Sequence, residues 1–115
     1  MYIELKGEAY DKQNSRAGKY TRASGLSSGM PYWTHSDGTQ ALWFKEGRWR
    51  IGPKSDRGTT MRGLESINSP LCPESVGSNW KYSDGEQFLD AQGSAKMYKY
   101  EGMIFQGNNQ FKNRK

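Results

Sequence analysis

The middle of the chain alternates apolar and polar residues in a pattern typical of antiparallel β-strands. Strand-like segments flank two turn signals, Asp37-Gly38 and Glu46-Gly47. A polar residue followed by glycine favours a two-residue hairpin loop, because a type I′ turn needs positive φ at both central positions. The pattern therefore predicts a three-stranded meander within residues 30–52.

These two turns fix a register for the meander. It sets Trp33 opposite Leu42, and Trp43 opposite Arg50. Because successive side chains point to opposite faces of a strand, the register assigns each residue to one face. One face carries Trp33, Leu42, Phe44, Trp49 and Ile51. The other carries Tyr32, Thr34, Trp43, Lys45, Arg48 and Arg50. We expect the first face to pack in the core.

The segment from Trp33 to Leu42 recurs, displaced by 47 residues, from Trp80 to Leu89. Six of the ten positions are identical, including the Ser-Asp-Gly turn. Agreement of this kind indicates an internal duplication, in which one supersecondary unit is used twice. We therefore predict a second hairpin at Asp84-Gly85, with the two units at about residues 30–52 and 77–105.

Outside these units the strand pattern is shorter. Residues 2–5 and 19–22 are further strand candidates, and residues 96–105 read as a hairpin with its turn at Glu101-Gly102. The Gly-, Ser- and Pro-rich stretch 53–79 predicts loops that link the two units. Within it, only residues 61–67 are expected to form a brief helix.

Together these elements predict an all-β fold, a small antiparallel sheet structure that is either a sandwich or a partly open barrel. The single domain is expected to span residues 1–106, because 115 residues fit one core. Residues 107–115 are predicted to be a flexible basic tail.

Composition supports a sheet whose core is filled by aromatic rings. The chain has 4 Trp, 7 Tyr and 4 Phe, but only 33% hydrophobic residues. Its formal charge of +5 favours anionic partners, although a mild basic excess is also ordinary for a soluble domain. No apolar run approaches the ~20 residues of a membrane span. Cys72 is the single cysteine, so no internal disulfide is expected, and the compartment stays open.

Residues capable of catalysis are sparse, and the sequence predicts no enzyme and no cofactor. His35 is the one histidine, and Asp37 lies two residues on. Both belong to a turn where Ser-Asp-Gly has a conformational role, and the second copy has Tyr82 in place of His35. Cys72 lacks a recognisable base, so we interpret it as a packed or inert thiol.

The polar face of the first meander is the better candidate for function. The register brings rings and cations together there, and such a surface can stack on sugars, bases or protein side chains. An alternative is that both faces of the sheet are partly buried, with Arg50 lying over Trp43 inside the protein. The predicted ligand-binding residues are Tyr32, Trp43, Lys45, Arg48 and Arg50.

An ordered set of motifs resembles small Trp-rich β modules that recur in multidomain eukaryotic proteins. The motifs are Gly29-x-Pro31-Tyr32, Ala41-Leu-Trp-Phe44, Trp49-x-Ile51-Gly52 and Trp80-x-x-x-Asp84-Gly85. The resemblance implies a non-catalytic accessory or interaction domain. We therefore expect a binding module for a protein or carbohydrate partner. The alternative is a domain that binds nucleic acid or another polyanion, with affinity that falls steeply with salt.

Overall fold

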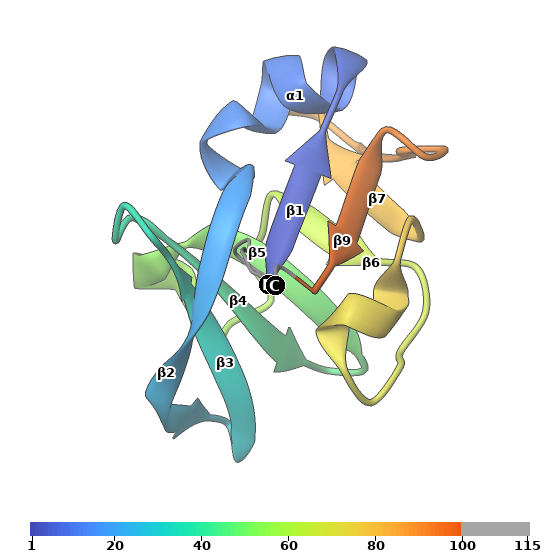
Figure 1. The fold of residues 1–115 in the computed structure, drawn as a ribbon. Coiled ribbons are helices and arrows are strands. Elements are labelled where there is room, and N and C mark those ends of the chain that lie inside the picture. Colours follow the sequence, from blue (N-terminus) through green and yellow to red (C-terminus); the bar gives the residue numbers. More distant parts are fainter. Residues whose placement is uncertain (100–115) are drawn as a thin grey trace, which may run out of the picture.

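A computed structural model describes residues 1–99 as a curled antiparallel sheet with one short helix (Figure 1). The strands are β1 (Tyr2–Leu5), β2 (Gly18–Ser27), β3 (Met30–His35), β4 (Gln40–Lys45), β5 (Arg48–Pro53), β6 (Leu64–Ser66), β7 (Trp80–Ser83), β8 (Phe88–Asp90) and β9 (Ala95–Tyr98). The α-helix is α1 (Gly7–Gln13), and the 3₁₀ helices are η1 (Asn14–Arg16), η2 (Lys54–Asp56) and η3 (Pro73–Val76).

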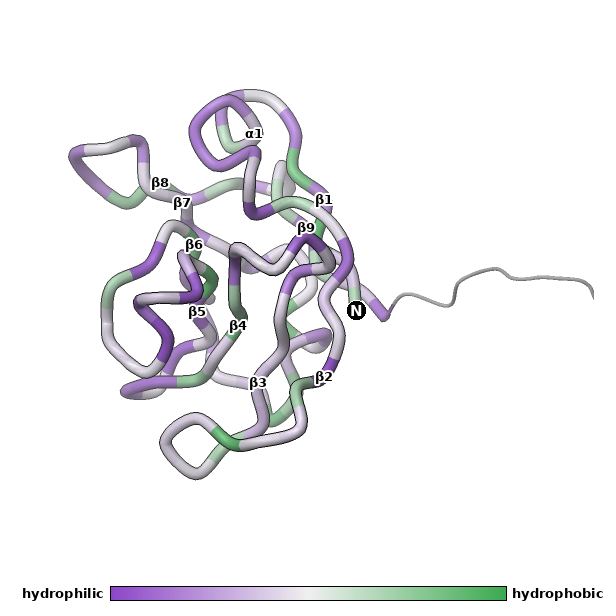
Figure 2. The backbone as a smooth tube through the Cα atoms, turned by 90° about the vertical axis from the view of Figure 1, so that its left-hand side faces the viewer, coloured by the Kyte–Doolittle hydropathy of each residue, from purple (hydrophilic) through white to green (hydrophobic). Residues whose placement is uncertain are grey.

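The nine strands form one sheet in the order β8-β7-β6-β5-β4-β3-β2-β1-β9. The sheet curls into a half-barrel, which confirms the predicted all-β class. Helix α1 lies at one end of the molecule and the β2–β3 hairpin at the other (Figures 1 and 2). Within residues 1–99, no helix has the length and apolar character needed to cross a membrane.

The predicted register of the first meander is confirmed. Trp33 pairs with Leu42, and Trp43 pairs with Arg50. Glu46 and Gly47 have φ values of 50° and 80°, as the predicted two-residue turn requires. The apolar face forms part of one core cluster with Leu64, Trp80, Tyr82 and Met97. Local pattern was sufficient here because side-chain alternation and the Glu46-Gly47 turn specify the same register.

At the two Asp-Gly sites the predicted type I′ turns are wrong. Gly38 and Gly85 have positive φ, but neither aspartate does. The Asp37 carboxylate instead accepts hydrogen bonds from the Thr39 backbone N–H at 2.9 Å and the Thr39 hydroxyl at 2.8 Å. These bonds hold the pKa of Asp37 below its usual range. An aspartate that bonds forward to the backbone stabilises an alternative turn.

The second hairpin has a register different from the first. Ser83 pairs with Phe88, and Tyr82 pairs with Leu89. The pairing of the first hairpin, displaced by 47 residues, would set Trp80 opposite Leu89. The observed register is shifted by two residues, which keeps the same side chains facing the core. The two segments share a motif and a buried face, but the structure does not give them the same strand pairing.

The predicted brief helix within residues 61–67 is also wrong. Leu64–Ser66 is β6, which pairs with β5 on one side and β7 on the other. Leu64 and Ser66 are fully buried, whereas Glu65 points to the opposite face. This alternation is the period of a strand, but three residues are too few to show it in the sequence. The predicted 96–105 hairpin is only partly described, because residues 100–105 lie outside the described part of the chain.

Helix α1 was not predicted, and it is attached to the sheet by side-chain hydrogen bonds. Gln13 donates from Nε2 to the Ser83 carbonyl at 2.8 Å, and Tyr82 donates its hydroxyl to Glu8 Oε1 at 2.6 Å. Gln13 is 7% exposed and lies against the backbone of Gly63. A side chain at position 63 would displace Gln13, since a Cβ there would be 2.1 Å from Gln13 Oε1.

We expect Gly63→Ala to lower the free energy of unfolding by about 1–3 kcal/mol, because the added methyl group overpacks the contact with Gln13. Gly25→Ala is the matched control, since nothing lies within 4 Å of a Cβ there and its φ is not in the left-handed region. Urea unfolding measures both changes. Equal stability of the two variants would show that α1 does not pack on Gly63 as described.

A second test uses alkaline pH. The hydrogen bond to Glu8 raises the pKa of Tyr82 from 10.0 to about 12. The neutral phenol is therefore favoured in the folded state, and its contribution is complete below pH 10.0 and lost as the pH rises through about 12. We expect the unfolding free energy of Tyr82→Phe to fall less than that of the wild type over this range. Burial raises the pKa of Tyr20 in both proteins, so this effect cancels. Identical pH profiles would contradict the Glu8–Tyr82 contact.

Candidate functional site

The predicted aromatic and basic face is not an open platform. Trp43 is 0% exposed, because the segment that follows β5 folds over it. The Trp43 indole N–H donates to the Thr59 carbonyl at 2.9 Å. A Cβ at Gly52 would lie 3.2 Å from the Arg62 Cα, which shows how closely the segment approaches the sheet. The alternative of a sheet buried on both faces therefore describes this region.

Arg50 lies on the same covered face and is 5% exposed. Its guanidinium lies 2.8 Å from Glu65 Oε1, and its Nε donates to the Lys45 carbonyl at 3.0 Å. Arg62 adds a second cation 2.8 Å from the same carboxylate oxygen. Burial lowers the pKa of Arg50, and the charge of Glu65 acts against this. Arg50 thus has a structural role, but its predicted place opposite Trp43 is confirmed.

The other predicted ligand-binding residues are brought to different surroundings. Tyr32 is half-buried beneath Arg57, whose guanidinium carbon lies 4.2 Å from the ring centroid. Arg48 donates to the hydroxyl of Ser69 at 3.1 Å. Lys45 is half-buried opposite Arg48 in the β4–β5 ladder. These groups do not combine with Trp43 and Arg50 into one accessible surface.

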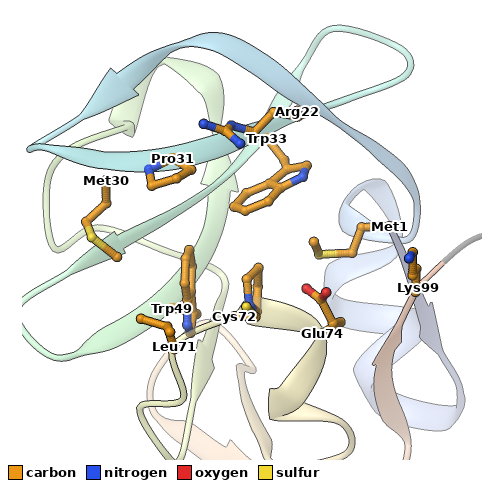
Figure 3. A pocket seen from close by; sticks show the side chains of 11 residues that line it. Met1, Arg22, Met30, Pro31, Trp33, Trp49, Leu71, Cys72, Glu74 and Lys99 are labelled. Atoms are coloured by element: carbon orange, nitrogen blue, oxygen red, sulfur yellow. The ribbon is translucent and has the colours of Figure 1, made fainter.

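The opposite face of the sheet leaves an open groove where the β2–β3 hairpin extends beyond the core. It has a volume of about 620 Å³ and we call it the Trp33 groove. One wall is formed by four residues of this hairpin, Arg22, Met30, Pro31 and Trp33 (Figure 3). Arg22 and Trp33 are partners across the β2–β3 ladder, which places both on the groove side. A ladder irregularity follows between Arg22 and Leu26.

The second wall is formed by four consecutive residues of the segment between β6 and β7, which are Leu71, Cys72, Pro73 and Glu74. Met1 and Lys99 lie at one end of the groove in Figure 3, and Met30 lies at the other. Leu71 is 86% exposed, the highest value among the large hydrophobic residues of the described chain. Most of the groove surface is thus carbon, with charged groups gathered toward one end.

Trp49 contacts both walls of the groove. It is 1% exposed, and its indole N–H donates to the Pro70 carbonyl at 2.9 Å. Its ring meets Trp33 edge to face with centroids 5.9 Å apart, and meets Phe44 similarly at 5.1 Å. Because Pro70 directly precedes Leu71, this hydrogen bond fixes the second wall relative to the first.

The His35 ring is held by contacts with the backbone, with Tyr20 and with Asp37. Its Nε2 lies 2.7 Å from the Ala17 carbonyl oxygen, and its ring packs edge to face on Tyr20 at 5.0 Å. Nδ1 lies 3.0 Å from both the backbone nitrogen and the carboxylate of Asp37. Among residues 1–99, no group of three or more His, Cys, Asp and Glu side chains is arranged to hold a metal ion.

The sequence pattern correctly placed Trp33 and Trp49 on the face that packs in the core, but it did not predict the groove. The second wall comes from a segment without periodicity, so its position depends on one long-range hydrogen bond to Pro70. In the sequence, the only indication of this wall was Leu71-Cys72 between two prolines, since an apolar residue there has no predicted strand or helix to join.

Matched tryptophan variants test which face is covered. We expect Trp43→Phe to lower the free energy of unfolding by roughly 2–3 kcal/mol, because it loses the bond to Thr59 and leaves a cavity. Trp33→Phe is the control, since its ring is only half-buried at the groove. Its loss should be below about 1 kcal/mol. Equal losses in urea unfolding would contradict the burial of Trp43.

Comparisons of the chain with protein-family models, with curated proteins and with solved structures found no match in any of the three. The groove must therefore be interpreted from its own residues.

Proposed function

We propose that the chain is a non-catalytic binding module that takes an apolar segment of a protein partner into the Trp33 groove. The observation that carries this proposal is the groove itself, an open volume of about 620 Å³ against the aromatic core. Ligand sites are concave and mostly apolar, with few polar groups that orient the ligand. This proposal keeps the expected class of function but moves the site away from Trp43.

The exposed leucine strengthens the case for a partner. Leu71 is exposed beside the groove, and the half-buried Met30 and Pro31 of the opposite wall continue the apolar surface. Contiguous exposed apolar surface marks interaction sites in soluble proteins, since it gains free energy only when covered. Met30 adds an unbranched side chain that can adapt to different ligand shapes.

The lining favours protein over carbohydrate. A sugar needs hydrogen-bonding groups for its hydroxyls, because a polar group buried without a partner costs free energy. The β2–β3 wall offers mainly Met30, Pro31 and the edge of Trp33, and the opposite wall begins with Leu71. These side chains match the apolar anchors of a peptide better than a sugar ring.

The local chemistry supports a non-catalytic role. His35, the one histidine of the sequence, lies against the Ala17 carbonyl and the Asp37 carboxylate and does not line the groove. The groove contains Cys72 and Glu74, but neither lies beside a histidine of the described chain. Binding is the activity that apolar walls supply.

The test uses a phage-displayed heptapeptide library, selected on the full chain. We expect enriched peptides to carry large apolar residues and to lose at least about tenfold in affinity toward Leu71→Asp, because a carboxylate then enters an apolar contact. Calorimetry with the synthetic peptides measures the loss.

Tyr10→Asp is the matched control, because Tyr10 is also exposed (48%) but does not line the groove, and its helix α1 lies at the opposite end of the molecule from the β2–β3 hairpin (Figure 1). Its affinity for the same peptides should equal that of the wild type. Selected peptides that bind Leu71→Asp as tightly as the wild type would overturn the proposed site. Binding of a glycan array that depends on Leu71, with no peptide selected, would overturn the proposed partner class.

A further inference from the structure

From the charges at the rim of the Trp33 groove, we infer the chemistry of the segment it takes: a large apolar side chain flanked by a carboxylate, which pairs with Arg22. This inference rests on the proposed function, since it describes the ligand of the same groove. It follows from the positions of the Arg22, Glu74 and Lys99 side chains relative to the apolar surface, as seen in Figure 3.

Arg22 places a guanidinium beside the groove, over the Trp33 ring, and has no acidic partner among residues 1–99. Its Cζ lies 5.8 Å from the centroid of the Trp33 ring, its ladder partner on β3. None of the ion pairs within residues 1–99 includes Arg22, and its side chain is exposed. Contact with the ring restricts the guanidinium, so less entropy is lost when it binds an anion.

Two other arginines have the acidic partner that Arg22 lacks among the described residues. Arg50 is paired with Glu65, and Arg62 shares the same carboxylate while lying over Phe88 at 4.1 Å. Arg22 therefore differs from Arg50 and Arg62 in having no carboxylate beside it among residues 1–99. A carboxylate supplied by the ligand completes the kind of arrangement that Glu65 provides for Arg50.

Glu74 gives the groove a direction. It belongs to η3 and lies on the wall opposite Arg22, near Lys99 and Met1 in Figure 3. A ligand carboxylate close to Glu74 meets a like charge as well as the cation of Lys99, whereas one on the β2–β3 side meets Arg22 with no carboxylate of the described lining beside it. The ligand is thus expected to place its anionic group against Arg22.

The remaining end of the groove accepts the apolar group. Met30, Pro31 and Leu71 lie together there, beside the ring of Trp49 (Figure 3). Burial of one large apolar side chain contributes more free energy than an exposed ion pair does. Affinity is therefore expected to come mainly from the apolar anchor, and selectivity from the charge beside it.

The experiment compares three hexapeptides that contain the same Phe-Leu pair flanked by Asp, by Asn or by Lys. Calorimetry at low salt measures their affinities for the full chain. We expect the Asp peptide to bind about three- to tenfold more tightly than the Asn peptide, and the Lys peptide to bind most weakly. Arg22→Gln should remove the advantage of Asp over Asn, and Glu74→Gln should increase the affinity of the Asp peptide about twofold.

Arg57→Gln is the matched control. It removes the same charge, and Arg57 also lies over a ring, that of Tyr32, but it does not line the groove. It should preserve the preference for Asp. If Arg57→Gln reduces the preference as much as Arg22→Gln, net charge explains it and the inference is wrong. Equal affinities of the three peptides overturn the inference while the proposed function stands.

Two further outcomes would contradict more than the preference for Asp. If none of the peptides binds the full chain or its variants, the proposed function itself fails. If sedimentation shows that the free chain forms a dimer which Leu71→Asp dissociates, the groove is covered by a second copy. That result overturns the assignment of an acidic, apolar peptide as its ligand.

Discussion

Hydrogen bonds from three buried indole N–H groups hold the irregular part of this protein in place. Trp43 donates to Thr59, Trp49 to Pro70, and Trp80 to Gly77. All three carbonyls belong to the segment between β5 and β7, which has only one three-residue strand and two 3₁₀ turns of its own. A long segment without regular structure must satisfy its backbone polar groups elsewhere, and the indoles meet part of that requirement. Each ring thereby fills the core and also fixes a loop.

These bonds produce the asymmetry between the two faces of the sheet. On one face, the bond to Thr59 draws residues 54–63 over the strands, so that Trp43 and Arg50 are buried. On the other face, the bond to Pro70 places Leu71 across from the β2–β3 hairpin, with a space between them. Trp33 lies where this hairpin extends past the core, so its ring forms a wall of the groove instead of being enclosed. The site we propose is therefore a consequence of how the loops are held, as much as of the strands.

Sequence pattern predicted the parts of the fold that local rules determine. Pairing within β3, β4 and β5 follows from side-chain alternation and from Glu46-Gly47, and β1 was predicted at its observed bounds. Errors arose where a side chain or a distant segment decides the outcome. The Asp37 carboxylate changed a turn that Asp-Gly alone predicts, and β6 exists because β5 and β7 lie on either side of it. The rings and cations of the covered face were placed in the correct register, but side-chain alternation carries no information about which loop covers them. The groove required Pro70 and Trp49 to meet across 21 residues of sequence.

Exchange of the four indole N–H protons with deuterium, followed by NMR, tests this account most directly. The protons of Trp43, Trp49 and Trp80 are buried and bonded to carbonyls, so they should exchange slowly, at rates that follow opening of the fold. Trp33 has no indole hydrogen-bond partner among the described residues, and its ring lies at the open groove, so its proton should exchange rapidly. Exchange at Trp43 as fast as that at Trp33 would show that residues 54–63 do not cover the sheet, and the assignment of the binding face to the Trp33 groove would be contradicted.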